Sequence, residues 1–298
     1  MSSAAAPAAL SLKVGNRRDR ARLSANLFWT VLCAGLSFLT LVPLFSIVYL
    51  VLRNGLVLLR PSVFTELPPA PGLEGGGVGN AIQGTLVMVA IALVLATPLG
   101  ILSAIYICEY APLSRLAGAV RFNAKLLTGI PSIICGVFAY AVVVVTTGSF
   151  SALAGGVALA VLALPTVLLT SEQALLGVPY ALREASYGLG ASRFQTIFRV
   201  VLPEARPAMM TGVMLAVARA AGETAPVLFT ALFSEYWLKG IMQPAASLSV
   251  LIFNFAGLPY PHQIQLAWTA SLILVALVTA ANVTAQLAFT KRQPGKKR

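Results

Sequence analysis

The sequence contains few charged residues, and acidic residues and histidine are especially scarce. Only 10% of the 298 residues are charged, whereas a soluble domain carries about 25%. Nine residues are acidic, and His262 is the only histidine. This composition excludes a soluble globular protein. A membrane enzyme is also disfavoured, because it needs a convergent cluster of catalytic side chains. His262 falls in a predicted external loop, where we expect a solvated side chain.

Cysteine is scarce as well. The three cysteines, Cys33, Cys108 and Cys135, lie in or at the ends of apolar stretches. None has a second cysteine or a histidine at a metal-ligand spacing, so we interpret them as packing residues and predict no metal site. The sequence also lacks the G-x-x-x-x-G-K-[ST] pattern of an ATP-binding loop. We therefore expect no catalytic residue and no cofactor in this chain.

Hydrophobic residues, in contrast, make up 58% of the chain and give it a mean hydropathy of +0.86. Six apolar stretches are long enough to cross a bilayer, which takes about 20 helical residues. This pattern predicts an all-α integral membrane protein with six transmembrane helices. The predicted spans are residues 27–52, 81–108, 126–145, 152–170, 207–233 and 266–289.

Two predicted external loops, residues 53–80 and 234–265, are rich in turn-forming residues. The first contains L-P-P-A-P-G-L-E-G-G-G-V-G-N, which indicates a shaped loop before a helix. The alternative is an anion-binding nest, although the lysine and hydroxyl residue of a phosphate-binding loop are missing. Asn80 is the predicted N-cap of the second span. The second loop contains the apolar piece 248–256, which is too short to span and predicts a surface or re-entrant helix.

The net charge is +12, and the basic residues gather in four places. Seventeen of the 21 lysines and arginines lie in residues 1–25, residues 115–125, the loop around Glu184, and residues 291–298. Basic segments beside membrane spans face the cytoplasm. We therefore predict cytoplasmic termini with basic tails at both ends. The positive charge then reflects proximity to membrane lipid and not binding to nucleic acid.

The longest polar interval between two apolar spans is residues 173–206. Within it, a helix-forming run and a second amphipathic run lie on either side of Gly190. Pro203 and Pro207 are expected to end the second helix, because proline removes a backbone donor and clashes with the preceding turn. The pattern predicts a helix–turn–helix over residues 181–203, which we call the knob.

The fifth predicted span carries charges inside the membrane, in the run A-R-A-A-G-E-T-A-P. Arg219 and Glu223 are four residues apart, which predicts that they pair on one helix face. A charge at the bilayer centre costs about 2.5–3.5 kcal/mol and usually faces a bundle interior or a wet cavity. A guanidinium matches phosphate or carboxylate oxygens, and Thr224 adds a hydroxyl. The pair either lines an anion path or is an inert pair that fixes helix packing.

The knob resembles the EAA loop of ABC-importer permeases. The matching residues are Glu184, Ala185, Gly190, Leu202 and Pro203. The resemblance implies that these residues couple the permease to a cytoplasmic ATPase subunit. Ser and Val replace the second Ala and the Ile of the family pattern.

Further motifs narrow the resemblance to the PstA-type permease subunits of bacterial phosphate ABC importers. The most specific are G-G-G-x-G-N-A-I-x-G-T and A-R-A-x-G-E-T-A-P. Sister PstC-type subunits also carry a G-E-T stretch, but the short first external loop and the following Ala-Pro favour the PstA type. The matching segments are residues 67–71, 75–85, 97–106, 129–133, 178–185 and 218–226.

This resemblance implies a type I ABC-importer (MetI-like) permease fold in the bacterial inner membrane. Residues 26–80 would supply the first span and an external loop, and residues 81–290 the core domain with the coupling loop 173–206. The implied partners are a PstC-type permease, two PstB-type ATPase subunits that hold ATP and Mg, and an external PstS-type phosphate-binding protein. Arg219, Glu223 and Thr224 would then line the substrate pathway.

Two alternatives remain open. An importer for another oxyanion, such as sulfate or molybdate, is opposed only by the two most specific motifs. A stand-alone anion transporter would need inverted repeats or several intramembrane charges, and the sequence shows no clear repeat and one such pair.

Overall fold

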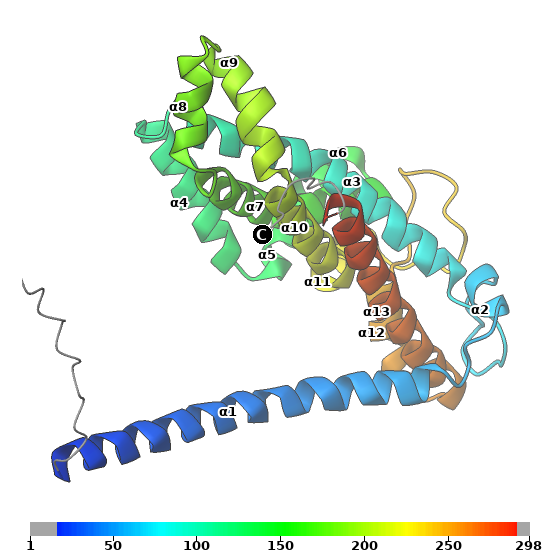
Figure 1. The fold of residues 1–298 in the computed structure, drawn as a ribbon. Helices are drawn as coiled ribbons and strands as arrows, with labels where there is room; N and C mark the ends of the chain where they lie inside the picture. Colours follow the sequence, from blue (N-terminus) through cyan, green and yellow to red (C-terminus); the bar gives the residue numbers. More distant parts are fainter. Residues whose placement is uncertain (1–16, 291–298) are drawn as a thin grey trace, which may run out of the picture. The chain divides into compact units, whose positions relative to one another are not determined.

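The computed structural model describes residues 17–290, with the side chains of residues 21–287. The predicted tail at residues 291–298 and residues 1–16 of the predicted N-terminal tail lie outside this range. The chain divides into two compact units, one ending at Leu50 and the other beginning at Val51. Within residues 17–290 every regular element is helical (Figure 1), so the predicted all-α class is confirmed.

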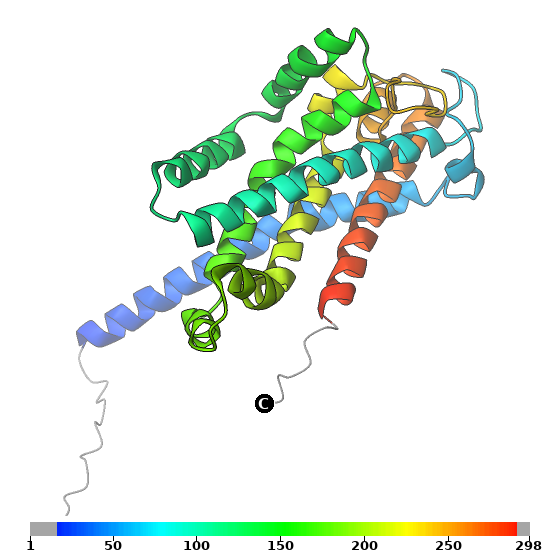
Figure 2. The same cartoon turned by 90° about the horizontal axis from the view of Figure 1, so that it is seen from above.

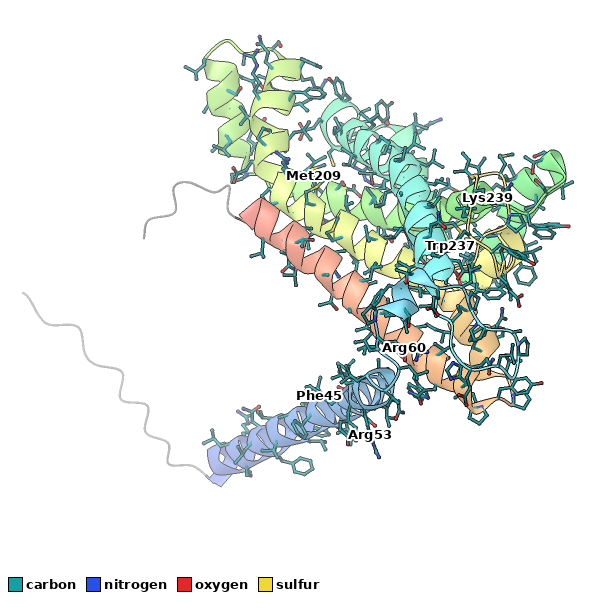
Figure 3. All side chains as sticks on the ribbon, turned by 90° about the vertical axis from the view of Figure 1, so that its right-hand side faces the viewer. Phe45, Arg53, Arg60, Met209, Trp237 and Lys239 are labelled. Atoms are coloured by element: carbon teal, nitrogen blue, oxygen red, sulfur yellow. The ribbon has the colours of Figure 1, made fainter. Side chains whose placement is uncertain are left out.

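The first unit consists of most of helix α1 (Arg17–Gly55). The helix begins at Arg17, so the last residues of the predicted 1–25 tail are already helical. Its large apolar side chains are exposed, Phe38 by 70% and Phe45 by 66%, and Phe45 projects from the helix in Figure 3. A helix that is apolar on all sides is suited to the hydrocarbon core of a bilayer.

The second unit holds fifteen further helical elements within the described residues. Among residues 17–290, and with α1 included, five helices are long and apolar enough to cross a membrane, or six if one bent pair counts as a single span. The elements, with η marking turns of π-helix, are α2 (Ser62–Thr65), α3 (Gly79–Ile105), η1 (Tyr106–Tyr110), α4 (Arg115–Gly129), α5 (Ser132–Ala139), η2 (Tyr140–Val144), α6 (Val145–Thr147), α7 (Ala152–Leu176), α8 (Tyr180–Gly188), α9 (Arg193–Thr196), η3 (Ile197–Val201), α10 (Leu202–Gly222), α11 (Ala225–Thr230), α12 (Leu248–Ala256) and α13 (Pro261–Thr290).

Helices α3 and α7 form the centre of the second unit and run side by side (Figure 2). Small residues bring them together: a Cβ added at Gly156 would lie 2.5 Å from Ile91 Cγ2, and one at Gly100 would lie 2.8 Å from Val167 Cγ1. Helix α10 packs on α7 in the same way, since a Cβ at Gly212 would lie 2.0 Å from Thr170 Oγ1. Glycine at such contacts allows close backbone approach in membrane helices.

The predicted third span, residues 126–145, is not one helix. Helices α4 and α5 meet at 108°, with the break at Ile130 and Pro131. The residue before a proline is forced into extended backbone, and Ile130 has ψ 135°. The beginning of the predicted span therefore belongs to α4, which also contains the basic segment 115–125.

The predicted bounds of the fifth span, residues 207 and 233, are both wrong. Pro203 and Pro207 do not end the knob, because one continuous helix runs from Arg193 to Gly222. The wide turn η3 precedes Pro203, and the amide of Leu202 there bonds Ile197 O, five residues back. A widened turn makes room for the proline ring, which would otherwise meet a carbonyl four residues earlier. The helix breaks instead after Gly222 and resumes as α11.

The loop before α3 is shaped by its glycines, as expected. Gly75 and Gly76 have φ of 91° and 65°. Two other expectations here are wrong. Asn80 is not an N-cap, because α3 already begins at Gly79, and Asn80 Nδ2 donates to Ser234 O at 2.8 Å. His262 is half-buried, and its Nε2 contacts both the amide nitrogen and the carbonyl oxygen of Gly75.

The segment between α11 and α12, residues 231–247, folds against the start of α3. Gln83 bonds both backbone groups of Leu238, each at 3.1 Å. Trp237 and Lys239 lie in this segment (Figure 3). It leads into α12, whose bounds Leu248–Ala256 confirm the predicted short helix.

Candidate functional site

The knob is a helical hairpin at the end of the second unit opposite α2 and α12 (Figure 1). Helices α8 and α9 are joined through Gly190, which has φ 80°. Ser192 caps α9, and its side chain and that of Gln195 complete a capping box. The buried hydroxyls of Ser186 and Thr196 lie 2.9 Å apart and hold the two helices together.

The predicted coupling residues fall into two groups on this hairpin. Glu184, Ala185 and Gly190 are exposed on the knob itself. Leu202 and Pro203 lie where the knob joins α10, and Leu202 packs there against the apolar cluster that contains Met209. Their coupling role stays a prediction.

The knob also exposes large apolar side chains, which the motif comparison did not single out. Leu189, at the turn, is 90% exposed. Exposed apolar side chains that cluster in this way mark an interaction surface. They are Leu182, Tyr187, Leu189, Phe194 and Phe198, and Tyr180 at the start of α8 is exposed as well.

Three arginines from three different helices form hydrogen bonds with η1, the π-helical turn that follows α3. The first is Arg183 of α8. Its Nη2 donates to Glu109 Oε1 at 2.7 Å, and its Nη1 donates to Val178 O at 2.7 Å. The side chains of Arg183 and Glu109 are only 13% and 9% exposed.

The second is Arg121 of α4. Its Nε pairs with Glu172 Oε1 of α7 at 2.5 Å, and Glu172 is buried. The other two guanidinium nitrogens donate to Ile107 O at 2.8 Å and Pro112 O at 3.1 Å. This arginine therefore joins α4 and α7 to η1.

The third is Arg193 of α9. Its Nη2 donates to the carbonyl oxygens of Glu109 and Tyr110, and its guanidinium lies over the Tyr110 ring, 5.0 Å from the centroid. Sequence reasoning used Arg121 only as a marker of membrane sidedness and did not find these contacts. The sequence did contain one indication of these contacts. The acidic partners Glu109 and Glu172 are single acidic residues at the ends of long apolar runs.

The intramembrane residues lie where α10 breaks. Arg219 Nε and Glu223 Oε1 are 3.4 Å apart, and the side chains are 39% and 17% exposed. Glu223 has extended backbone beyond the helix end, so the pair is not formed on one helix face as expected. Thr224 follows in the break.

Two buried hydroxyls connect the elements near the backbone of Glu223. Ser249 of α12 donates to Glu223 O at 2.8 Å, and Thr85 of α3 accepts from the Leu248 amide at 2.9 Å. Through Ser249 the break is hydrogen-bonded to α12, and α12 is in turn hydrogen-bonded to α3 through Thr85. Such polar groups are costly in a membrane unless they are satisfied in this way.

Comparison with known proteins identifies the family. Residues 96–292 match the family described as binding-protein-dependent transport system inner membrane component. The phosphate transport system permease protein PstA of Yersinia pestis is 39% identical over 277 residues, covering 93% of this chain and 92% of that protein. The chain belongs to the PstA-type permeases of this family.

Other PstA relatives extend the similarity. The permease of Haemophilus influenzae is 37% identical, covering 88% of this chain and 94% of that protein. A probable PstA of Methanocaldococcus jannaschii is 32% identical, covering 90% of this chain and 95% of that protein. The family resemblance inferred from the motifs is thus confirmed. This PstA-type chain is a multi-pass membrane component of an ABC importer and not its ATP-hydrolysing subunit.

Solved structures show the same fold. An inward-facing structure of the methionine transporter MetNI matches with a TM-score of 0.57 and 24% identity, covering 73% of this chain and 95% of that chain. A bacterial alginate transporter structure matches with a TM-score of 0.61 and 16% identity, covering 89% and 94%. The MetI-like permease fold of this PstA-type chain is therefore confirmed.

Proposed function

We propose that this PstA-type permease moves inorganic phosphate into the cytoplasm as one membrane subunit of an ATP-driven importer. The observation that carries the proposal is the Arg219–Glu223 pair at the break after α10. It supplies a partly exposed cation after a stretch of the helix, residues 207–218, that carries no charge. The similarity to permeases named for phosphate transport supports phosphate as the anion.

A phosphate ion that leaves water needs a compensating charge, since burying an unpaired ion costs several kcal/mol or more. Arg219 provides that charge. Its bond to Glu223 uses Nε at the long distance of 3.4 Å, and a guanidinium has five N–H donors arranged as a fork. Arg219 exchanges Glu223 for the passing phosphate, and Thr224 contributes a hydroxyl. The exchange must be transient, because a site that binds too tightly cannot release its ion.

The knob is the docking point for a PstB-type ATPase subunit that holds ATP and Mg. Exposed Glu184, Ala185 and Gly190 and the neighbouring apolar side chains supply the surface. Basic residues of α4 and of the knob lie at this end of the second unit, and the tendency of basic segments to face the cytoplasm supports a cytoplasmic knob and cytoplasmic termini. The family pattern supports two such ATPase subunits and a PstC-type permease partner.

The opposite end of the second unit receives the PstS-type phosphate-binding protein. The shaped glycine loop and residues 231–247 meet there around α3, and Glu74 and Lys239 are exposed on them. Substrate delivery at this end and ATPase contact at the knob give alternating access across the bacterial inner membrane.

Reconstitution tests the proposal. The chain is purified with its PstC-type, PstB-type and PstS-type partners, placed in vesicles, and supplied with phosphate, sulfate or molybdate. We expect ATP hydrolysis and uptake to rise with phosphate alone. Stimulation by sulfate or molybdate without phosphate would support the other-oxyanion alternative, and uptake without the ATPase would support a stand-alone transporter.

A further inference from the structure

Three arginine side chains bond to η1, the turn at the end of α3. The last carbonyls of a helix have no partner inside the helix and carry partial negative charge. At η1 these carbonyls accept from Arg121 at Ile107 and from Arg193 at Glu109 and Tyr110. The side chain of Glu109 then adds a full negative charge that pairs with Arg183.

Two of these arginines belong to the knob, and one does not. Arg183 lies on α8 and Arg193 on α9, so each helix of the hairpin has its own link to η1. Arg121 lies on α4 and connects η1 to Glu172 of α7. The links from the knob are therefore distinct from the link within the body of the second unit.

An apolar cluster joins Ile105 at the end of α3 to Ile197 and Val201 of the knob, but it leaves part of the space between the knob and η1 unfilled. An open cleft of about 900 Å³ lies there, and its walls include Glu109, Arg183, Tyr187 and Arg193. The polar bonds of the two arginines span this cleft. Because the Arg183–Glu109 pair is largely buried, solvent screens it less than a surface ion pair.

We propose that Arg183 and Arg193 are positioning residues that fasten the knob to the end of α3, so that movement of the knob displaces α3 as well as α10. The proposal rests on the proposed docking of the ATPase at the knob. Helix α10 follows the knob through its continuous backbone. Helix α3 is far away in sequence and follows the knob through contacts across space, which are these arginine bonds and the apolar cluster in which Ile105 lies with Ile197 and Val201.

The test uses the full importer in vesicles and two variants of this chain. Arg193→Gln removes the cation from the η1 carbonyls and from the Tyr110 ring. The double variant Glu109→Gln with Arg183→Gln neutralises the buried pair without leaving one charge unpaired. Arg115→Gln is the matched control, because it removes an exposed arginine of α4 at the same end of the unit.

The first readout is the amount of phosphate moved per ATP hydrolysed. We expect both variants to hydrolyse ATP while this ratio falls about fivefold or more, the lower range of a typical coupling energy. The control is expected to keep the wild-type ratio. A wild-type ratio in both variants overturns the proposal, and so does a lower yield of assembled importer with an unchanged ratio.

The second readout is amide hydrogen exchange on binding of a non-hydrolysable ATP analogue. In the wild type we expect exchange to change in the knob and in residues 100–110. In the variants we expect the change in the knob to persist and the change in residues 100–110 to become smaller. An unchanged response at residues 100–110 in both variants overturns the proposal. This measurement needs no substrate, so it separates failure of the fastening from failure of the proposed phosphate transport.

Discussion

Arg219 and Glu223 form an ion pair between a helix and the extended segment that follows it. Nε and Oε1 are 3.4 Å apart, yet α10 ends at Gly222 and Glu223 has ψ 130°. The guanidinium therefore moves with α10, whereas the carboxylate is tied through its backbone to Ser249 of α12. Any tilt of α10 against α12 changes the length of this bond.

The first prediction concerns Arg219 itself. Arg219→Gln should abolish phosphate uptake by the assembled importer, because no cation then compensates the ion. Arg219→Lys should retain part of the uptake, since lysine keeps the charge but loses the planar fork. Uptake of labelled phosphate into vesicles measures both.

The double change Arg219→Met with Glu223→Met separates the anion path from an inert pair. Both charges vanish together, so a pair that only fixes packing predicts intact uptake. We expect uptake to be lost. Wild-type uptake in this double variant would sink the pathway proposal.

The second prediction concerns the turn of the knob. Gly190 has φ 80°, a conformation that costs other residues roughly 1–2 kcal/mol and is worst for β-branched side chains. Gly190→Val should lower ATP-driven uptake while the chain still inserts. Gly188→Ala is the matched control, because Gly188 is helical and a Cβ there meets no atom within 4 Å. Normal uptake in the valine variant argues against the docking role.

The third prediction fixes the sidedness of the second unit. Cysteines placed at exposed Glu74 and Lys239 should cross-link to the phosphate-binding protein. A cysteine at Leu189 on the knob should cross-link to the ATPase instead. Mass spectrometry of the cross-linked pairs reads the result, and the reverse pattern inverts the proposed topology.

The fourth prediction concerns packing. A Cβ at Gly212 would lie 2.0 Å from Thr170 Oγ1, so Gly212→Val should destabilise the α7–α10 contact by about 1–3 kcal/mol. Thermal unfolding in detergent measures the loss. Gly118→Ala on α4 is the control, because a Cβ there meets no atom within 4 Å. An equal loss of stability in the two variants contradicts the close contact.

Much of the fold could be predicted from the sequence, because apolar residues mark a membrane-spanning helix along its whole length. The second, fourth and sixth spans were found from apolar length alone, and even the nine-residue α12 was predicted with its observed bounds. The positions of prolines predicted the ends of helices less well. Pro131 does break a helix, whereas Pro203 follows a wide π turn that removes its clash. Whether a proline breaks a helix depends on the backbone before it, which the sequence pattern does not contain.

The site was predictable only in part. Arg219 and Glu223 are close in sequence, so their contact was expected, although the helix break between them was not. The pairs Arg121–Glu172 and Arg183–Glu109 are separated by 51 and 74 residues. Such pairs depend on how α3, α4 and α7 are placed in space, and no local spacing rule identifies them.

The continuous helix from Arg193 to Gly222 has a mechanical consequence. It holds the knob at one end and Arg219 near the other, and 30 residues at ~1.5 Å each make it about 45 Å long. A rigid lever of this length, tilted by only about 5° around one end, moves the other end by roughly 4 Å. That displacement is about as long as the bond between Arg219 and Glu223. If the ATPase docks at the knob as proposed, a small rotation of the knob would therefore be sufficient to open or close the pair near the other end of this helix.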